Sequence, residues 1–301
     1  RRQLAQMVLG KLLEGVHEQR LLVIADGPLN GIPFAALPDI SSPGAMLLDR
    51  FVIGHAPSLA LAFAQPAAAG ASTSRVAVVS DPVYAADDKR LASAGPAARL
   101  RGSRQLSPNK LTRLPYSALE ARAVQDTFGV KDTVALSGFE ATRARVLELA
   151  QQEWSVLHFA THAIAREDAP ERSSLYLSEY APDGTFHPES QLSTSDIMGS
   201  GLRARVVVLS GCSTGDGSTL RGEGVLGLTY GFLANGTGAV VASLWPVEDA
   251  STARLMSEFY RAYRASGNAA QALRAAQLRA RASQPAAAAW SSFVVRANGF
   301  P

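Results

Sequence analysis

The sequence has few of the features that mark disulfide-rich, membrane or nucleic-acid-binding proteins. Among its 301 residues there is a single cysteine, Cys212, so no disulfide can form within the chain. This is typical of a reducing compartment, and we expect a cytoplasmic protein. The chain has no apolar run long enough to cross a membrane and no secretory signal, which argues against a membrane partner. The net charge of +3 is too small to indicate direct nucleic-acid binding.

The sequence also shows no cluster of metal ligands, no internal repeat and no phosphate-binding loop. The Gly-rich pieces GDG and GEG are too short to cradle a phosphate. We therefore expect no cofactor and no metal. With 47% hydrophobic and 18% charged residues, the chain has the composition of a globular protein with a sizeable core.

The stretch VVVLSGCSTG at 206–215 joins a buried strand to a tight turn that carries the cysteine. Its first four residues are a continuous apolar run, as in strands covered on both faces of a parallel sheet. In such sheets, ligand and catalytic sites lie beyond the carboxyl ends of the strands. Cys212 is placed to react there, although a free cysteine alone is as often a small buried hydrophobe.

A second strand, SVLHFATHA at 155–163, ends in His162, which lies 50 residues before Cys212. This separation matches the distance between the catalytic His and Cys of caspases. Two parallel strands that end side by side would bring the imidazole to the thiol. A free thiol, with a pKa of about 8.5, needs such a neighbour to form a thiolate at neutral pH. His158, four residues earlier, is interpreted as a buried packing residue.

Four motifs, HFATHA, LSGCSTG, GEGVLGL and VVASLWPVED, occur here in an order that resembles the CHAT proteases. These caspase-like domains are grouped with caspases and separases among the cysteine peptidases and often follow tetratricopeptide repeats. The chain departs from the family at two places: Ala163 stands where Gly is usual, and Ser213 replaces a common acidic residue. Because the chain begins at Arg1 rather than Met, we expect it to be a fragment with a repeat or sensor module upstream.

The resemblance implies a cysteine endopeptidase that cleaves a protein substrate. Cys212 would be the nucleophile and His162 would assist proton transfer. The backbone N–H groups of Ala163 and Cys212 would bind the oxyanion. Some relatives recognise a basic substrate residue through an acidic residue two positions before the cysteine, where this chain has Ser210. The remaining candidates for reading a substrate side chain are acidic: Asp196, Asp216 and Glu223.

The fold class that we expect is α/β, a caspase-like three-layer sandwich with helices on both faces of a mainly parallel sheet. The apolar runs predict about six strands, the last of them, AWSSFVVRANG at 289–299, at an edge. Residues 47–54 predict a further strand in an N-terminal accessory subdomain. We divide the chain into that pseudo-caspase-like subdomain at 1–70 and a catalytic core at 71–301.

Residues 87–113 carry seven Lys and Arg against two Asp, among Pro, Gly and Ser. This composition favours a solvated loop, with an activation loop or a docking surface as alternatives. Two other functions stay open for the whole chain. One is a non-catalytic scaffold for protein–protein signalling, and the other is thiol chemistry on a small molecule. For the peptidase we expect activation through an upstream sensor or partner, with little activity in this chain alone.

Overall fold

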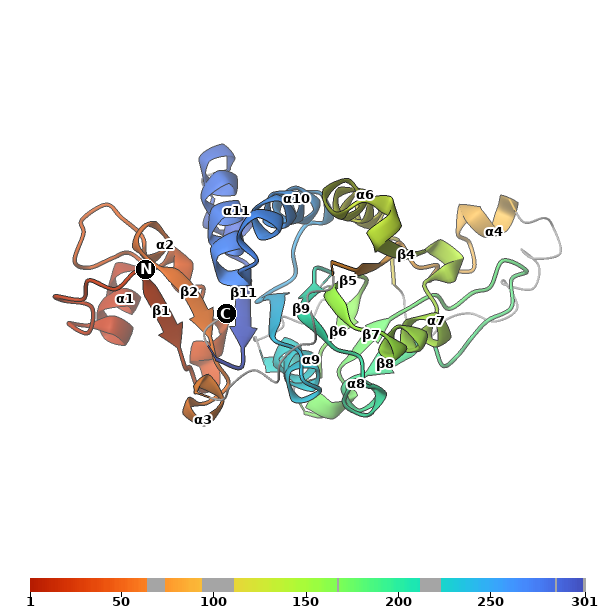
Figure 1. The fold of residues 1–301 in the computed structure, drawn as a ribbon, viewed down its shortest axis with the longest axis horizontal. Helices are drawn as coiled ribbons and strands as arrows, with labels where there is room; N and C mark the ends of the chain where they lie inside the picture. The colour runs from red at the N-terminus through yellow and green to blue at the C-terminus, as the bar shows by residue number, and fades with distance from the viewer. Residues whose placement is uncertain (64–73, 94–110, 167, 212–222, 285, 300–301) are drawn as a thin grey trace.

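The computed structural model describes residues 1–301 except 64–73, 94–110, 167, 212–222, 285 and 300–301. Its centre is an eight-stranded sheet in the order β1-β2-β11-β10-β9-β5-β3-β4 (Figure 1). Every neighbouring pair is parallel except β10 with β11. The strands are β1 Arg20–Val23, β2 Val52–His55, β3 Val76–Ser80, β4 Thr133–Ser137, β5 Trp154–Ala160, β9 Ala204–Leu209, β10 Ala239–Ser243 and β11 Phe293–Ala297.

Helices cover both faces of this sheet and make a three-layer sandwich (Figure 1). One face packs its apolar side chains against α6 (Ser117–Phe128), α10 (Asp249–Ser266) and α11 (Ala269–Ser283). The other face packs against α7 (Arg143–Glu148), α8 (Thr194–Ser200) and α9 (Glu223–Ala234). The central strands β3, β5 and β10 are buried at every residue, which is why their sequences are mostly apolar rather than alternating. The expected α/β class with a mainly parallel sheet is confirmed.

The N-terminal segment adds strands to the same sheet rather than forming a separate one. Its helices are α1 Arg2–Leu9, α2 Leu47–Arg50 and α3 Leu59–Ala62, so the strand predicted at 47–54 is wrong for its first half. The described sheet has eight strands rather than about six because β1 and β2 join it through β11. The boundary proposed at residues 70 and 71 lies outside the described residues, and the two-part division stays a proposal.

The prediction that residues 289–299 form an edge strand is wrong. β11 is internal, antiparallel to β10 on one side and bridged to β2 through Arg296 and His55 on the other. All five of its residues are buried, including Arg296, whose pKa burial lowers to about 10. An arginine within a short apolar run suggests a solvated strand, and nothing local in the sequence shows that distant strands cover it.

At this junction, His55 makes the stability of the protein depend on pH. Burial, together with the charge of Arg296, lowers the pKa of His55 to about 3. Its ring lies edge-on to Phe34 at 5.9 Å, and Nδ1 is 3.3 Å from the Val295 carbonyl oxygen. The unfolded chain takes up a proton at this residue near pH 6.5, whereas the folded chain does not until about pH 3. Stability should therefore fall as the pH falls between these two values.

We expect the protonation of His55 to lower the free energy of unfolding by about 2 kcal/mol between pH 7 and pH 5, because only the unfolded chain takes up this proton over that range. Urea unfolding of the parent and of His55→Gln at both pH values measures this contribution. The variant should be less stable than the parent at pH 7 but should lose less stability on acidification. Equal losses in the two proteins would show that His55 is not the titrating group.

A small antiparallel sheet follows the end of β5. It contains β6 Ala163–Ile164, β7 Ser174–Tyr176 and β8 Gln191–Ser193, in that order. The sequence of residues 175–190, with its Asp-Gly turn, suggests a β-hairpin. In the structure these residues form mainly the long loop between β7 and β8, which is closed by a bridge between Tyr180 and Phe186. α4 (Lys89–Ser93) and α12 (Ala287–Trp290) complete the named helices. None of the helices in the described part of the chain is long and apolar enough to cross a membrane.

Candidate functional site at the end of β5

The strands that carry His162 and Cys212 are neighbours, as the sequence predicts. β5 pairs in parallel with β9, with Phe159 opposite Leu209, so the two strands end at the same edge of the sheet. Gly211 then packs on the chain that follows β5. A Cβ at residue 211 would lie 2.1 Å from the carbonyl oxygen of Thr161, so only glycine fits this approach. Cys212 is the next residue in the sequence but lies outside the described residues.

The His162 imidazole is held by a backbone carbonyl. Its Nε2 lies 2.6 Å from the carbonyl oxygen of Thr112. A carbonyl oxygen only accepts hydrogen bonds, so Nε2 must carry the proton. In the neutral ring Nδ1 is then unprotonated and is the basic nitrogen. Nδ1 is buried and has no hydrogen-bond partner within the described part of the chain.

Tyr84 holds the backbone of His162. The Tyr84 hydroxyl accepts a hydrogen bond from the His162 N–H at 3.1 Å and reaches the Tyr176 carbonyl oxygen at 3.3 Å. The two rings lie 4.9 Å apart between centroids. His162 is only 2% exposed. Burial lowers the pKa of His162, and the hydrogen bond to Thr112 acts in the opposite direction. The imidazole is therefore neutral at pH 7 and available as a base.

The Ala163 N–H, which the sequence predicts to bind an oxyanion, donates to the Gly211 carbonyl oxygen at 2.9 Å. To bind an oxyanion, this N–H must exchange the Gly211 carbonyl for the substrate oxygen. The second predicted donor, the N–H of Cys212, lies outside the described residues. The oxyanion roles of both residues stay proposals.

Of the three acidic candidates for substrate binding, the structure describes only the side chain of Asp196. Asp196 forms a capping box at the start of α8, where it accepts from the Ser193 N–H at 2.9 Å and from the Arg143 guanidinium at 2.9 Å. Burial acts to raise its pKa, but the bonds from Ser193 and the charge of Arg143 lower it overall. Asp216 lies outside the described residues, as does the side chain of Glu223 at the start of α9.

His158 lies in a buried polar network on β5, as its position in the strand predicts. It is fully buried, with Nδ1 at 2.6 Å from the Tyr260 hydroxyl and Nε2 at 3.1 Å from a Glu120 carboxylate oxygen. Ser210, two residues before Cys212, is 1% exposed and lies 3.3 Å from the same Nε2. Because Ser210 faces this network, its hydroxyl is not available to read a substrate side chain.

The two ends of the basic segment 87–113 are packed into the protein, so the interpretation as a solvated loop is wrong there. Leu91 is fully buried and Leu111 packs with Tyr84 and Tyr176. Thr112 was not singled out by the sequence because it acts through its carbonyl, which every residue has. Residues 94–110 lie outside the described residues.

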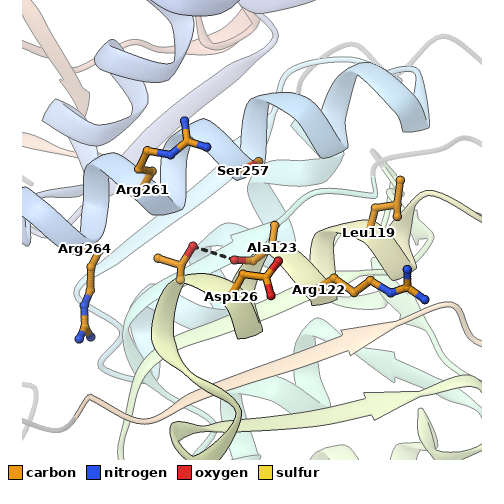
Figure 2. A pocket seen from close by; sticks show the side chains of 8 residues that line it. Leu119, Arg122, Ala123, Asp126, Ser257, Arg261 and Arg264 are labelled. Carbon is orange, nitrogen blue, oxygen red and sulfur yellow. Dashed lines mark hydrogen bonds between the residues drawn. The ribbon is translucent and has the colours of Figure 1, made fainter.

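Figure 2 shows a groove elsewhere on the molecule, between α6 and α10. It is lined by Leu119, Arg122, Ala123, Asp126, Thr127, Ser257, Arg261 and Arg264. Arg261 pairs with Glu258, and the Arg264 guanidinium lies 5.7 Å from the Phe128 ring centroid. None of these residues belongs to the surroundings of His162. The groove and the candidate site are therefore separate.

The contact of Gly211 with Thr161 predicts a sensitive position. Gly211→Ala should push the end of β9 away from His162, because the clashing atoms belong to the backbone and cannot turn aside. We expect a loss of about 1–3 kcal/mol of unfolding free energy, as for overpacked cores. Gly199→Ala in α8 is the matched control, since nothing lies within 4 Å of its added Cβ. Urea unfolding compares the two, and equal stabilities would contradict the close approach.

The fold and this edge define an α/β protein with a buried, carbonyl-bound histidine beside the turn that leads to its only cysteine. Within the described residues, no group of His, Cys, Asp and Glu could hold a metal ion. The model of the CHAT domain matches residues 1–297, and the chain belongs to the CHAT domain family.

Two relatives among known proteins are similar over most of this chain. Human tetratricopeptide repeat protein 28 is 30% identical over 282 residues, and the mouse protein of the same name is 27% identical over 282 residues. Each match covers 82% of this chain but 10% of the relative. The chain thus spans about a tenth of the length of these relatives.

Two solved structures also resemble the chain. The Arg-specific cysteine proteinase gingipain R matches with a TM-score of 0.43 and 10% identity, over 75% of this chain and 46% of that one. The complex of the pro- and mature domains of Porphyromonas gingivalis RgpB matches with a TM-score of 0.49 and 10% identity, over 98% and 67%. The assignment of the fold here depends on the chain's own strand order and register.

Proposed function

We propose that the chain is a cysteine endopeptidase in which His162 and Cys212 form the catalytic dyad. The observation that supports this most is the 2.6 Å contact between His162 Nε2 and the Thr112 carbonyl oxygen. It fixes the tautomer in which Nδ1 is the base. Membership of the CHAT domain family and the parallel pairing of β5 with β9 support the same function.

In this mechanism Nδ1 of His162 takes the proton of the Cys212 thiol, and the thiolate attacks the scissile carbonyl carbon. The resulting oxyanion is bound by backbone N–H groups, each of which typically contributes about 2.7–4 kcal/mol to lowering the barrier. The imidazolium then gives its proton to the leaving amine, and the C–N bond breaks to leave a thioester. Water, deprotonated by His162, then attacks the thioester carbonyl carbon. The C–S bond breaks, the carboxylic acid product leaves, and the imidazolium returns its proton to the Cys212 thiolate.

The proposal includes activation by a partner or an upstream repeat module. The Ala163 N–H is bound to the Gly211 carbonyl oxygen, so one proposed oxyanion donor must be released before turnover. Binding energy from a partner can shift such an equilibrium if it favours the released arrangement. We therefore expect little turnover by residues 1–301 alone and more when the partner is bound. Human and mouse relatives named for tetratricopeptide repeats support a repeat module as that partner.

The same occupied N–H favours a second candidate, a non-catalytic scaffold that keeps the fold and binds other proteins. A peptidase needs the thiol, whereas a scaffold does not. In either case we propose a cytoplasmic protein with protein partners. Small-molecule thiol chemistry has no observation in its favour.

A proteome-derived peptide library separates these functions. The chain, together with the proposed upstream module, is incubated with the library, and new amino termini are identified by mass spectrometry. For a peptidase we expect cleavage with a recurring side chain next to the cut, absent with Cys212→Ala. A scaffold would give the same peptides with both proteins.

A further inference from the structure

Asp81 has an unusual backbone conformation at the edge of the sheet that carries His162. It follows β3, the neighbour of β5, and has a φ of 48°. No other non-glycine residue in the described part of the chain has a positive φ. Asp tolerates this region better than most residues, but the conformation still costs energy and persists only where the surroundings hold it.

The Asp81 carboxylate is held by two arginines. Arg113 binds it with both arms of the guanidinium, Nε to Oδ1 at 2.8 Å and Nη2 to Oδ2 at 2.7 Å. Arg90 adds a contact of 3.1 Å to Oδ2 and donates to the Asp81 carbonyl oxygen at 2.7 Å. A two-armed pair fixes orientation as well as distance. Arg113 directly follows Thr112, whose carbonyl binds His162, so this pair anchors the residue next to that carbonyl.

A second link joins the Asp81 backbone to the same segment. The Ser117 hydroxyl accepts a hydrogen bond from the Asp81 N–H at 2.9 Å and donates to the Leu114 carbonyl oxygen at 2.6 Å. The residues after Thr112 are thus tied to Asp81 through side chain and main chain, while buried Leu111 anchors the residue before it. The Thr112 carbonyl has little freedom to turn away from His162.

We propose that Asp81 and Arg113 are positioning residues that hold the Thr112 carbonyl on Nε2 of His162 and so keep Nδ1 as the base. This inference rests on the proposed function, in which Nδ1 takes the thiol proton. When the pair is broken, the Thr112 carbonyl moves and the ring is free to carry its proton on Nδ1 instead. That tautomer cannot accept a proton at Nδ1, so fewer molecules are competent for catalysis.

The test uses Asp81→Asn, Arg113→Gln and Arg113→Lys. Asparagine keeps the size and the tolerance for positive φ but removes the charge. Lysine keeps the charge of Arg113 but not the two-armed geometry. The matched control is Arg281→Gln, which breaks another two-armed pair, between Arg281 and Asp49, on α11 and α2. Thermal unfolding shows which variants are folded, and Arg113→Gln decides the outcome if Asp81→Asn does not fold.

The first readout is the 15N NMR spectrum of the imidazoles, which needs no peptidase activity. The chain has five histidines, so the His162 signals can be assigned by comparison with His162→Asn. We expect the Nε2–H tautomer in the parent and in Arg281→Gln. In Asp81→Asn and Arg113→Gln we expect a mixture of tautomers and a lower pKa for His162, with partial recovery in Arg113→Lys. Parent-like tautomer and pKa in the folded variants would overturn the proposal.

The second readout is cleavage of a peptide found with the library. We expect kcat/KM to fall about 10–100-fold in Asp81→Asn and Arg113→Gln, mostly through kcat, as for misplaced catalytic groups. Unchanged kcat would contradict the positioning role. If the parent cleaves nothing, the proposed function fails, while the NMR spectra still test whether the ion pair fixes the tautomer.

Discussion

Cys212→Ala is expected to lower peptide cleavage to the background rate while changing the melting temperature by a few degrees at most. The proposed mechanism has no other nucleophile, because Cys212 is the chain's only cysteine. Replacing a thiol by a hydrogen removes contacts equal to about one methylene group, roughly 0.8 kcal/mol. The measurement is cleavage of the best library peptide by the full-length protein, with differential scanning fluorimetry on the same sample.

Cys212→Ser is the matched variant, because it replaces the thiol by a hydroxyl of similar size. Its cleavage should also be near background, since a hydroxyl is far harder to deprotonate than a thiol. Parent-like cleavage by a folded Cys212→Ala protein would remove Cys212 from the nucleophile role.

His162→Asn should have the second largest effect, lowering kcat/KM by about 10²–10⁴-fold, the usual contribution of a general base. Without the imidazole, the pKa of the Cys212 thiol should rise toward its ordinary value of about 8.5. The rate of alkylation by iodoacetamide against pH reports this directly. In the parent the rate should reach its plateau at lower pH than in the variant.

His17→Asn is the control for this comparison, because His17 is exposed near the N-terminus and takes no part in the site. Its alkylation profile and cleavage should match the parent. Identical profiles for His162→Asn and the parent would mean that His162 does not act on the thiol.

The central sheet could be predicted because its strands are buried on both faces. The runs VAVV at 76–79 and VVVL at 206–209 are apolar without interruption, and strand–helix alternation indicates parallel pairing. The same logic predicted that β5 and β9 end together. It failed for β11, because one edge of this strand is covered by β2, which lies more than 200 residues earlier in the chain.

The candidate site was predicted only where a side chain carries the chemistry. His162 was identified from its type and its place at a strand end. Thr112 acts through a carbonyl. The Asp81–Arg113 pair joins residues 32 positions apart, and Arg113 lies in a segment whose composition suggested a solvated loop. Composition averages over a segment, whereas the packing of Leu111 and the pairing of Arg113 depend on single residues.

A crystal structure of the full-length protein with a peptide aldehyde tests the central claim most directly. The aldehyde should be based on a peptide that the library shows to be cleaved. We predict a bond from its carbonyl carbon to Cys212 Sγ, with its oxygen accepting from the N–H groups of Ala163 and Cys212. His162 Nε2 should stay on the Thr112 carbonyl, with Nδ1 facing the adduct. An unmodified Cys212, or an adduct beyond the reach of His162, would contradict the proposed dyad.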